Sequence, residues 1–115
     1  MTIGNKMTDQ IQEKKTTTIF NAVTTNQQSD TFPFAPKERT IEAWVTGTGT
    51  VGATLKVYGA NTDRSSNGVL LATITLSGTT SDSAGSVLSG SWGYIYVVLS
   101  GITGTGAAVT FNVAI

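Results

Sequence analysis

The stretch VGATLKVYG, residues 51–59, decides the fold class of this 115-residue chain. Side chains point alternately to the two faces of a β-strand, so a strand with one buried face repeats its apolar residues with a period of two. The stretch follows that period, because apolar residues alternate with small or polar ones, in the order Val51, Gly52, Ala53, Thr54, Leu55, Lys56, Val57, Tyr58. We therefore expect an amphipathic strand that packs one face against a core.

The same period recurs on both sides of this stretch. Beside a short strand around residues 86–88, we expect strands at residues 17–23, 40–46, 69–77, 92–100 and 107–115. Glycine and asparagine tolerate positive φ and favour turns, so we expect turns or loops at residues 47–50, 61–68 and 101–106. Short strands at near-regular spacing indicate an all-β protein, an antiparallel β-sandwich or jelly roll of seven to eight short strands.

The composition argues against most chemistry. Histidine and cysteine are both absent, which removes the usual general base near neutral pH, the thiolate nucleophile, the common zinc ligands and any disulfide. The 7 Lys and Arg balance the 7 Asp and Glu, so no basic field attracts nucleic acid or an anionic membrane. We therefore expect a protein that is not an enzyme, holds no metal or cofactor, and binds neither nucleic acid nor membrane.

The charged residues are unevenly placed along the chain. Thirteen of the fourteen lie between Lys6 and Arg64, and Asp82 is the only one in residues 65–115. Gly, Thr and Ser together make up 44 of the 115 residues. A surface with so few charges indicates contact with another protein. The alternative is that Thr and Ser simply supply the polar face of exposed strands.

The first residues differ in character from the rest. Residues 1–16 mix charged side chains with few large apolar ones, so we expect an extended N-terminal arm, followed by a β-sandwich domain over residues 17–115. The arm has no apolar stretch resembling a signal peptide, and no apolar run in the chain reaches the ~20 residues of a membrane span. This predicts a soluble protein of a cytoplasm.

A second aromatic segment lies between the first two expected strands. Residues 32–36 contain two prolines, which cannot donate hydrogen bonds to a full strand ladder. We expect the rings of Phe32 and Phe34 to pack over a sheet edge.

Trp92, Tyr94 and Tyr96 are the strongest candidates for a binding surface. Their spacing of i, i+2 and i+4 places all three rings on one face of the expected strand. Such a ladder either fills a core or a subunit interface, or forms a platform on which sugars stack. No Asp, Asn or Arg accompanies it on the strand to fix sugar hydroxyls, so packing in a core or interface is the favoured interpretation.

Two weaker patterns involve acidic residues. Oxygen-bearing side chains alternate like calcium ligands from Asn61 to Asn67, but the loop lacks the glycine and the bidentate glutamate of a calcium loop. Asp63 and Asp82 are candidates for a pair of catalytic carboxylates, but no base, metal or oxyanion motif accompanies them. Structural loop residues are the better interpretation of both patterns.

Three stretches resemble small virion proteins of tailed bacteriophages, namely ATLKVYGAN (53–61), GVLLATITLSGT (68–79) and WGYIYVVLSGITGTGA (92–107). The shared pattern is a strand ending in a Tyr-Gly-(Ser/Ala)-Asn turn, an aliphatic-Thr-Leu-Ser-Gly strand, and a Trp-x-Tyr strand closing on Ser-Gly. The resemblance covers about residues 41–115. The chain departs from the family at residues 62–67, TDRSSN, where relatives often carry an Asp-Gly-x-x-Trp loop.

The resemblance implies a capsid decoration or cement protein, a structural virion component that binds and stabilises the mature head lattice. Its partner would be the major capsid protein, and its location the capsid surface after assembly in the host bacterial cytoplasm. Its form would be a homo-oligomer, with a homotrimer as the first expectation and a dimer as the second. The residues that we expect at its interfaces are Ile3, Ile11, Phe32, Phe34, Trp92, Tyr94 and Tyr96. The alternative is a tail or fibre module that binds host polysaccharide through the aromatic ladder.

Overall fold

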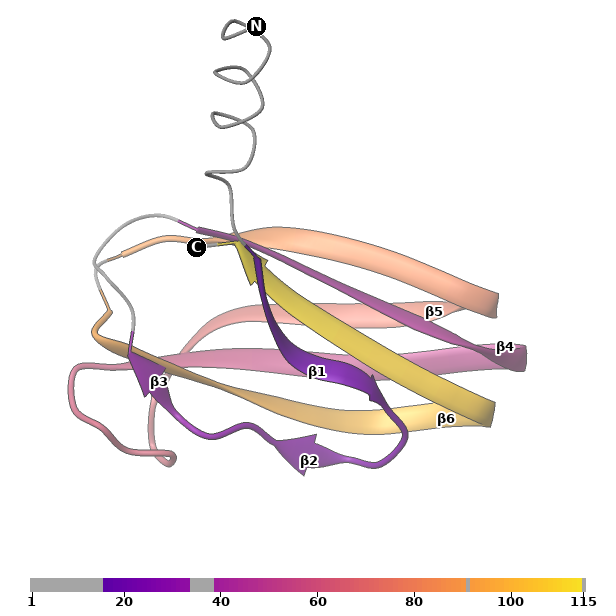
Figure 1. The fold of residues 1–115 in the computed structure, drawn as a ribbon, viewed down its shortest axis with the longest axis horizontal. Helices are drawn as coiled ribbons and strands as arrows, with labels where there is room; N and C mark the ends of the chain where they lie inside the picture. The colour runs from indigo at the N-terminus through magenta and orange to yellow at the C-terminus, as the bar shows by residue number, and fades with distance from the viewer. Residues whose placement is uncertain (1–15, 34–38, 91, 115) are drawn as a thin grey trace, which may run out of the picture.

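The computed structural model describes residues 16–33, 39–90 and 92–114, and all of its regular structure is β-strand. Six strands form one antiparallel sheet (Figure 1). Their bounds are β1 Thr16–Val23, β2 Gln27–Gln28, β3 Phe32–Pro33, β4 Arg39–Ala60, β5 Val69–Leu88 and β6 Tyr94–Ala114. The strand order is β1-β6-β4-β5, and β2 and β3 pair with β6 as well. The prediction of an all-β antiparallel protein is confirmed. The described residues contain no helix with the length and apolar character needed to cross a membrane.

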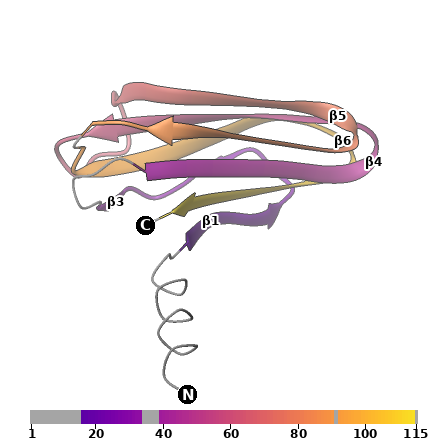
Figure 2. The same cartoon turned by 90° about the horizontal axis from the view of Figure 1, so that it is seen from above.

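The predicted number and length of the strands are wrong. The described residues form six strands, of which β4, β5 and β6 have 22, 20 and 21 residues. The turns that we expected at residues 47–50 and 101–106 lie inside β4 and β6. Residues 78–88, where we expected only a short strand around residues 86–88, all lie inside β5. Each of these long strands instead bends back on itself at one end of the molecule (Figure 2).

Residues with positive φ make these bends. Gly49 in β4, Thr80 in β5 and Gly104 in β6 have φ values of 73°, 63° and 113°. Glycine is the residue that adopts such a conformation at least cost. At Gly104 a side chain is also excluded sterically, since a Cβ atom there would lie 2.7 Å from the Thr50 carbonyl oxygen. The predicted turn residues therefore bend the strands without ending them, because the paired neighbours continue on the other side.

The bends divide the sheet into two facing layers (Figure 2). What we call the first layer contains β1 together with residues 107–114, 39–46 and 81–88. What we call the second layer contains β2 and β3 together with residues 94–100, 51–60 and 69–79. The neighbours of β4 are the same in both layers: Val45 pairs with Asp82 and Val109, and Leu55 pairs with Ile74 and Leu99.

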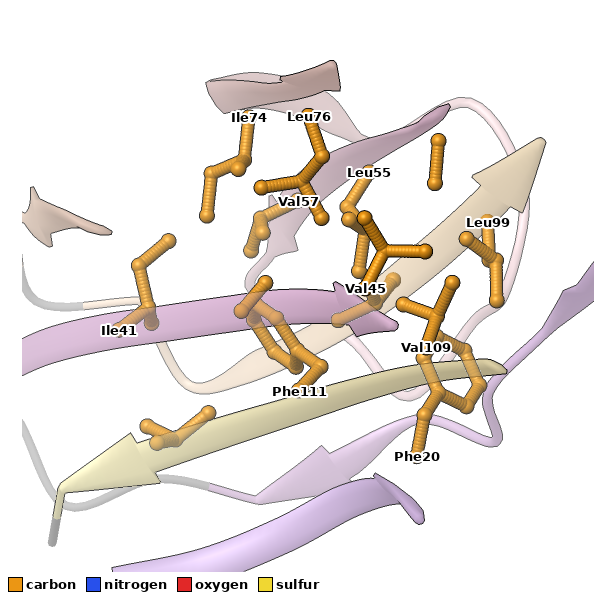
Figure 3. Close-up of a cluster of buried hydrophobic side chains, with 14 of the residues drawn as sticks. Phe20, Ile41, Val45, Leu55, Val57, Ile74, Leu76, Leu99, Val109 and Phe111 are labelled. Atoms are coloured by element: carbon orange, nitrogen blue, oxygen red, sulfur yellow. The ribbon is translucent and has the colours of Figure 1, made fainter. Parts of the chain in front are cut away.

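A single hydrophobic core fills the space between the layers (Figure 3). The expected apolar face of residues 51–57 is buried, and so are the alternating residues 107–113 of β6. The rings of Phe20 and Phe111 lie with centroids 6.5 Å apart, which joins β1 to the core. Full burial of one Val, Leu, Ile or Phe side chain contributes about 1.5–3 kcal/mol. Residues of both layers share this cluster, so neither layer has a core of its own.

Candidate interaction surfaces

The predicted ladder of three aromatic rings is not formed. Tyr96 lies on the outer face of the second layer beside Tyr58, its partner on β4, with ring centroids 5.1 Å apart and the planes tilted by 39°. Trp92 precedes β6, which begins at Tyr94. Side-chain alternation applies only within a strand, so the spacing of the sequence did not determine where the Trp92 ring lies.

The ring of Trp92 packs at the end of the core rather than on the outer face. A Cβ atom built on Gly59 would lie 2.8 Å from Cγ and Cδ2 of Trp92. Gly59 follows Val57 by two residues and faces the core side of β4. Glycine at this position therefore leaves the space that the indole ring occupies. Trp92 and Tyr94 are both half-buried.

A loop of the same chain covers Tyr96. The Tyr96 hydroxyl accepts a hydrogen bond of 3.0 Å from the Gly68 backbone N–H. Two further bonds hold residues 61–68 across this side of the sheet: Gln28 Nε2 donates to the Ser65 carbonyl at 2.7 Å, and Thr31 Oγ1 donates to Asp63 Oδ1 at 2.5 Å. Tyr96 is only 5% exposed as a result. A sugar has no open face of this ring on which to stack.

Of the other predicted interface residues, the structure describes only the backbone of Phe32. Ile3, Ile11 and Phe34 fall outside the described residues. The backbone of Phe32 pairs with Ile95 in the β3–β6 ladder, and its side chain is outside the described part of the structure. A role for these residues, and for Trp92, Tyr94 and Tyr96, at an interface with another protein stays a prediction.

The acidic residues of the loops make structural contacts. Asp63 accepts the bond from Thr31, and Asp82 Oδ2 accepts a bond of 2.8 Å from the Ser77 backbone N–H next to the bend of β5. Within residues 16–33, 39–90 and 92–114, no group of three or more Asp and Glu side chains is placed to hold a metal ion. The contact of Asp63 agrees with its interpretation as a structural loop residue, whereas Asp82 lies within β5 rather than in a loop and makes its contact at the bend of that strand.

The outer face of the first layer is broad and nearly uncharged. We call it the first-layer face, and Glu42 is its single charged residue. Alternation with the buried core positions assigns to it Thr16, Thr18, Thr40, Glu42, Trp44, Thr46, Ser81, Ser83, Gly85, Val87, Ala108, Thr110, Asn112 and Ala114. Trp44 lies near its middle, half-buried between its cross-strand neighbours Ser83 and Thr110. The outward residues of β4 and β5 on this face are exposed, apart from half-buried Trp44, whereas Thr110 and Asn112 of β6 are only 8% and 9% exposed and Thr110 Oγ1 accepts a bond from the Ala22 N–H. Among the described residues, no loop is bonded across it as residues 61–68 are across the second layer.

A shallow depression lies at one end of the first-layer face. It has a volume of about 360 Å³ and is lined by Thr16, Thr40, Ile41, Glu42, Asn112 and Ala114. Asn112 is 9% exposed, and its buried Oδ1 atom has no hydrogen-bond partner among the described residues. The sequence pattern identified the outward residues of β4, but it carried no signal for which outer face is left uncovered.

The comparisons with known proteins show the fold alone. SPBc2 prophage-derived protein YomS matches with a TM-score of 0.53 and 16% identity, over 88% of this chain and 91% of that one. A protein of the Bacillus endospore appendages, a family of disulfide-linked pili, matches with a TM-score of 0.51 and 15% identity, over 88% and 83%. VP2 of infectious bursal disease virus matches less well, with a TM-score of 0.48 and 12% identity, over 89% of this chain and 33% of VP2. No family model and no curated protein sequence matches the chain.

Proposed function

We propose that this chain is a non-enzymatic structural protein of a tailed-phage virion, and that it decorates the mature head by binding the major capsid protein. The first-layer face carries the proposal, because its outward residues are rich in Thr and Ser and bear Glu42 as their single charge. Depletion of charge is the compositional mark of the centre of a protein interface. The resemblance of residues 41–115 to small phage virion proteins supplies the class of partner.

The architecture supports the same proposal. Each long strand contributes one half to each layer, so each layer has four strand segments side by side. Their orders are β1-β6-β4-β5 in the first layer and β2/β3-β6-β4-β5 in the second, where β2 and β3 share one place beside β6. Two facing four-stranded sheets are the arrangement of a jelly roll, a fold used by viral capsid domains. A sandwich of this kind presents one sheet face to a partner while the other face is closed by its own loop.

The proposed mechanism is passive. The first-layer face buries hydroxyl and small apolar side chains against the capsid shell, with Trp44 as the one large ring at its centre. Aromatic residues at the centre of an interface contribute most of its binding energy. Contacts repeated over a symmetric homo-oligomer add up by avidity, so each one can be modest. In this proposal the residues that precede β1 form an arm that reaches the neighbouring capsid subunits.

Co-sedimentation with expanded phage heads that lack the protein tests the proposal. We expect saturable binding at fixed lattice positions in subsequent cryo-electron microscopy. A lysine introduced at Ser83, beside Trp44, would be desolvated in the interface and should weaken binding at least about tenfold. Thr105→Lys is the matched control, since Thr105 is exposed at the bend of β6 and outside the first-layer face.

Two results would overturn the proposal. One is the absence of saturable binding to any head. The other is equal loss of binding by Ser83→Lys and Thr105→Lys. The polysaccharide-binding alternative would be favoured if the protein were located at the tail. It would also require sugar-dependent quenching of tryptophan fluorescence that Trp92→Ala abolishes.

A further inference from the structure

The two sides of the sheet end in very different edge strands. β5 pairs with β4 alone, so along its whole length its other side has no neighbouring strand among the described residues. An open strand edge presents unpaired N–H and C=O groups that invite pairing with another strand. Proteins normally guard such edges with lysine, proline, bulges or very short strands.

The opposite edges carry these guards. The pairing of β1 with β6 is interrupted by two register shifts, and Ala22 in β1 has a positive φ of 52°. β2 and β3 are two residues long each, and β3 contains Pro33. A strand added from outside would find no regular ladder on that side of either layer.

β5 carries almost none of these guards. Its 20 residues, VLLATITLSGTTSDSAGSVL, include no lysine, arginine or proline, and Asp82 is their single charge. The exposed large hydrophobic side chains found in the described residues are Val69, Leu70 and Val87, at 49%, 49% and 51% exposure. All three belong to β5. The edge without guards therefore carries all the exposed large hydrophobic side chains of the described residues.

The geometry of β5 identifies the residues available for pairing. The Ser77 N–H bonds to the Asp82 carboxylate, so it points away from β4. Backbone groups alternate in direction along an antiparallel strand, and the N–H groups of Thr75 and Thr73 consequently point away from β4 as well. A register shift opposite Val57 and Tyr58 interrupts the ladder at Leu71. The regular open run is thus Ala72–Leu76, with Ile74 at its centre.

We propose that this run pairs antiparallel with the same run of a second copy of the chain, around a two-fold axis at Ile74. Thr73 of one copy then faces Thr75 of the other, and the two residues exchange backbone hydrogen bonds. The run contains no charged side chain, so self-pairing brings no like charges together, and threonine pairs across strands are favourable. Pairing about a two-fold axis uses this run of both copies at once, so neither copy offers the run to a third, and the assembly closes at two copies.

This inference refines the oligomer in the proposed function and rests on that proposal only in treating the chain as a homo-oligomer. A strand edge is self-complementary about a two-fold axis, so it selects a dimer over a trimer. It also leaves the first-layer face open, because the new contact extends the sheet sideways.

Light scattering of the isolated full chain over a concentration series tests the pairing. We expect a dimer of twice the 11.9 kDa chain mass. The double variant Thr73→Lys with Thr75→Lys places lysines opposite one another and should raise the dimer dissociation constant at least about tenfold. The variant Thr73→Glu with Thr75→Lys places opposite charges in the same positions and should keep the dimer. Thr16→Lys with Thr18→Lys, on the guarded edge of β1, is the matched control with the same spacing and should leave the dimer intact.

Backbone pairing itself is tested by Thr75→Pro. This change removes an N–H that points away from β4, so it should dissociate the dimer and leave a folded monomer, as judged by circular dichroism. A wild-type chain that is monomeric at every concentration, a trimer, open-ended fibres, or a dimer unaffected by the two lysines would each overturn the inference. A monomer that still binds phage heads would overturn it and leave the proposed function standing, whereas a dimer that binds no head would do the reverse.

Discussion

The two layers share one core, yet among the described residues a loop of the chain covers the outer face of one layer and not that of the other. On the second layer, residues 61–68 fold back over the sheet and bury Tyr96 against Tyr58. On the first layer, the outward residues around Trp44 and Glu42 have no such cover among the described residues. An aromatic-rich strand face in the sequence therefore became an internal contact, and a plain face of threonine and serine became the open surface.

The difference teaches that a cluster of aromatic residues in the sequence does not by itself locate an open surface. Aromatic rings are costly to leave in water, so a chain that can cover them with its own loop does so. Hydroxyl-bearing side chains are satisfied by water and need no cover. The face left open is consequently the one that lacks a cluster of aromatic rings.

The largest expected effect tests whether the two layers are one unit. Phe111→Ala empties a fully buried site in the first layer and should lower the free energy of unfolding by about 4 kcal/mol. Leu55→Ala, its counterpart in the second layer, should lower it by about 3 kcal/mol. Denaturant unfolding should remain a single transition by both fluorescence and circular dichroism. Two separate transitions in either variant would show that the layers unfold independently.

A smaller effect tests the cover over the second layer. Tyr96→Phe removes the hydroxyl that accepts the Gly68 N–H, and should cost about 1 kcal/mol. Hydrogen exchange of residues 61–68 should accelerate together with it. Tyr58→Phe is the control, because it keeps the ring pair and the bond to Gly68. Equal exchange in the two variants would mean that the Tyr96 hydroxyl does not hold the loop.

The next prediction concerns the sign of two changes on the first-layer face. Asn112→Val replaces a buried acceptor that has no partner in the described part of the chain, and should raise the free energy of unfolding by about 1 kcal/mol. Thr110→Val, two residues earlier, removes the acceptor of the Ala22 N–H at 3.1 Å and should lower it. Thermal denaturation of both variants checks the signs. Destabilisation by Asn112→Val would indicate that this amide has a structural role.

The smallest effect belongs to the tie between Thr31 and Asp63. Thr31→Val removes an exposed hydrogen bond, and exposed sites of this kind usually change stability by no more than about 0.5 kcal/mol. Exchange of the amides around Asp63 should increase while the melting temperature stays nearly constant. A large fall in melting temperature would mean that residues 61–68 contribute to global stability.

The core was predictable because the alternation of core-facing and outward-facing residues continues unchanged through the bends of the strands. The core side chains of β4 stay odd-numbered from Ile41 to Val57, and those of β6 stay odd-numbered from Ile95 to Val113. That constancy of parity is itself a sign of a bent continuous strand, since a true turn between separate strands imposes no such relation. The glycines at residues 47–50 and 101–106 were read as turns because local residue preferences do not record whether neighbouring strands continue.

The site was less predictable for reasons of the same kind. The spacing of Trp92 and Tyr96 assumed one strand, but β6 begins at Tyr94 and the Trp92 ring fills the space beside Gly59. The contact of Gly68 with Tyr96 joins residues 28 positions apart, and no local pattern encodes it. The openness of β5 likewise depends on strand order, which a single sequence does not display.

The strand order also determines when the chain can complete its fold during synthesis. β6 leaves the ribosome after the other five described strands, yet it lies between β1 and β4, and the bond from Ala22 to Thr110 spans 88 positions of the chain. The β4–β5 hairpin can form early, but it has no second sheet neighbour until β6 arrives. Folding dominated by such distant pairings takes milliseconds to seconds. Throughout that interval the future core is exposed, and a chain of zero formal net charge has little charge repulsion to keep its copies apart.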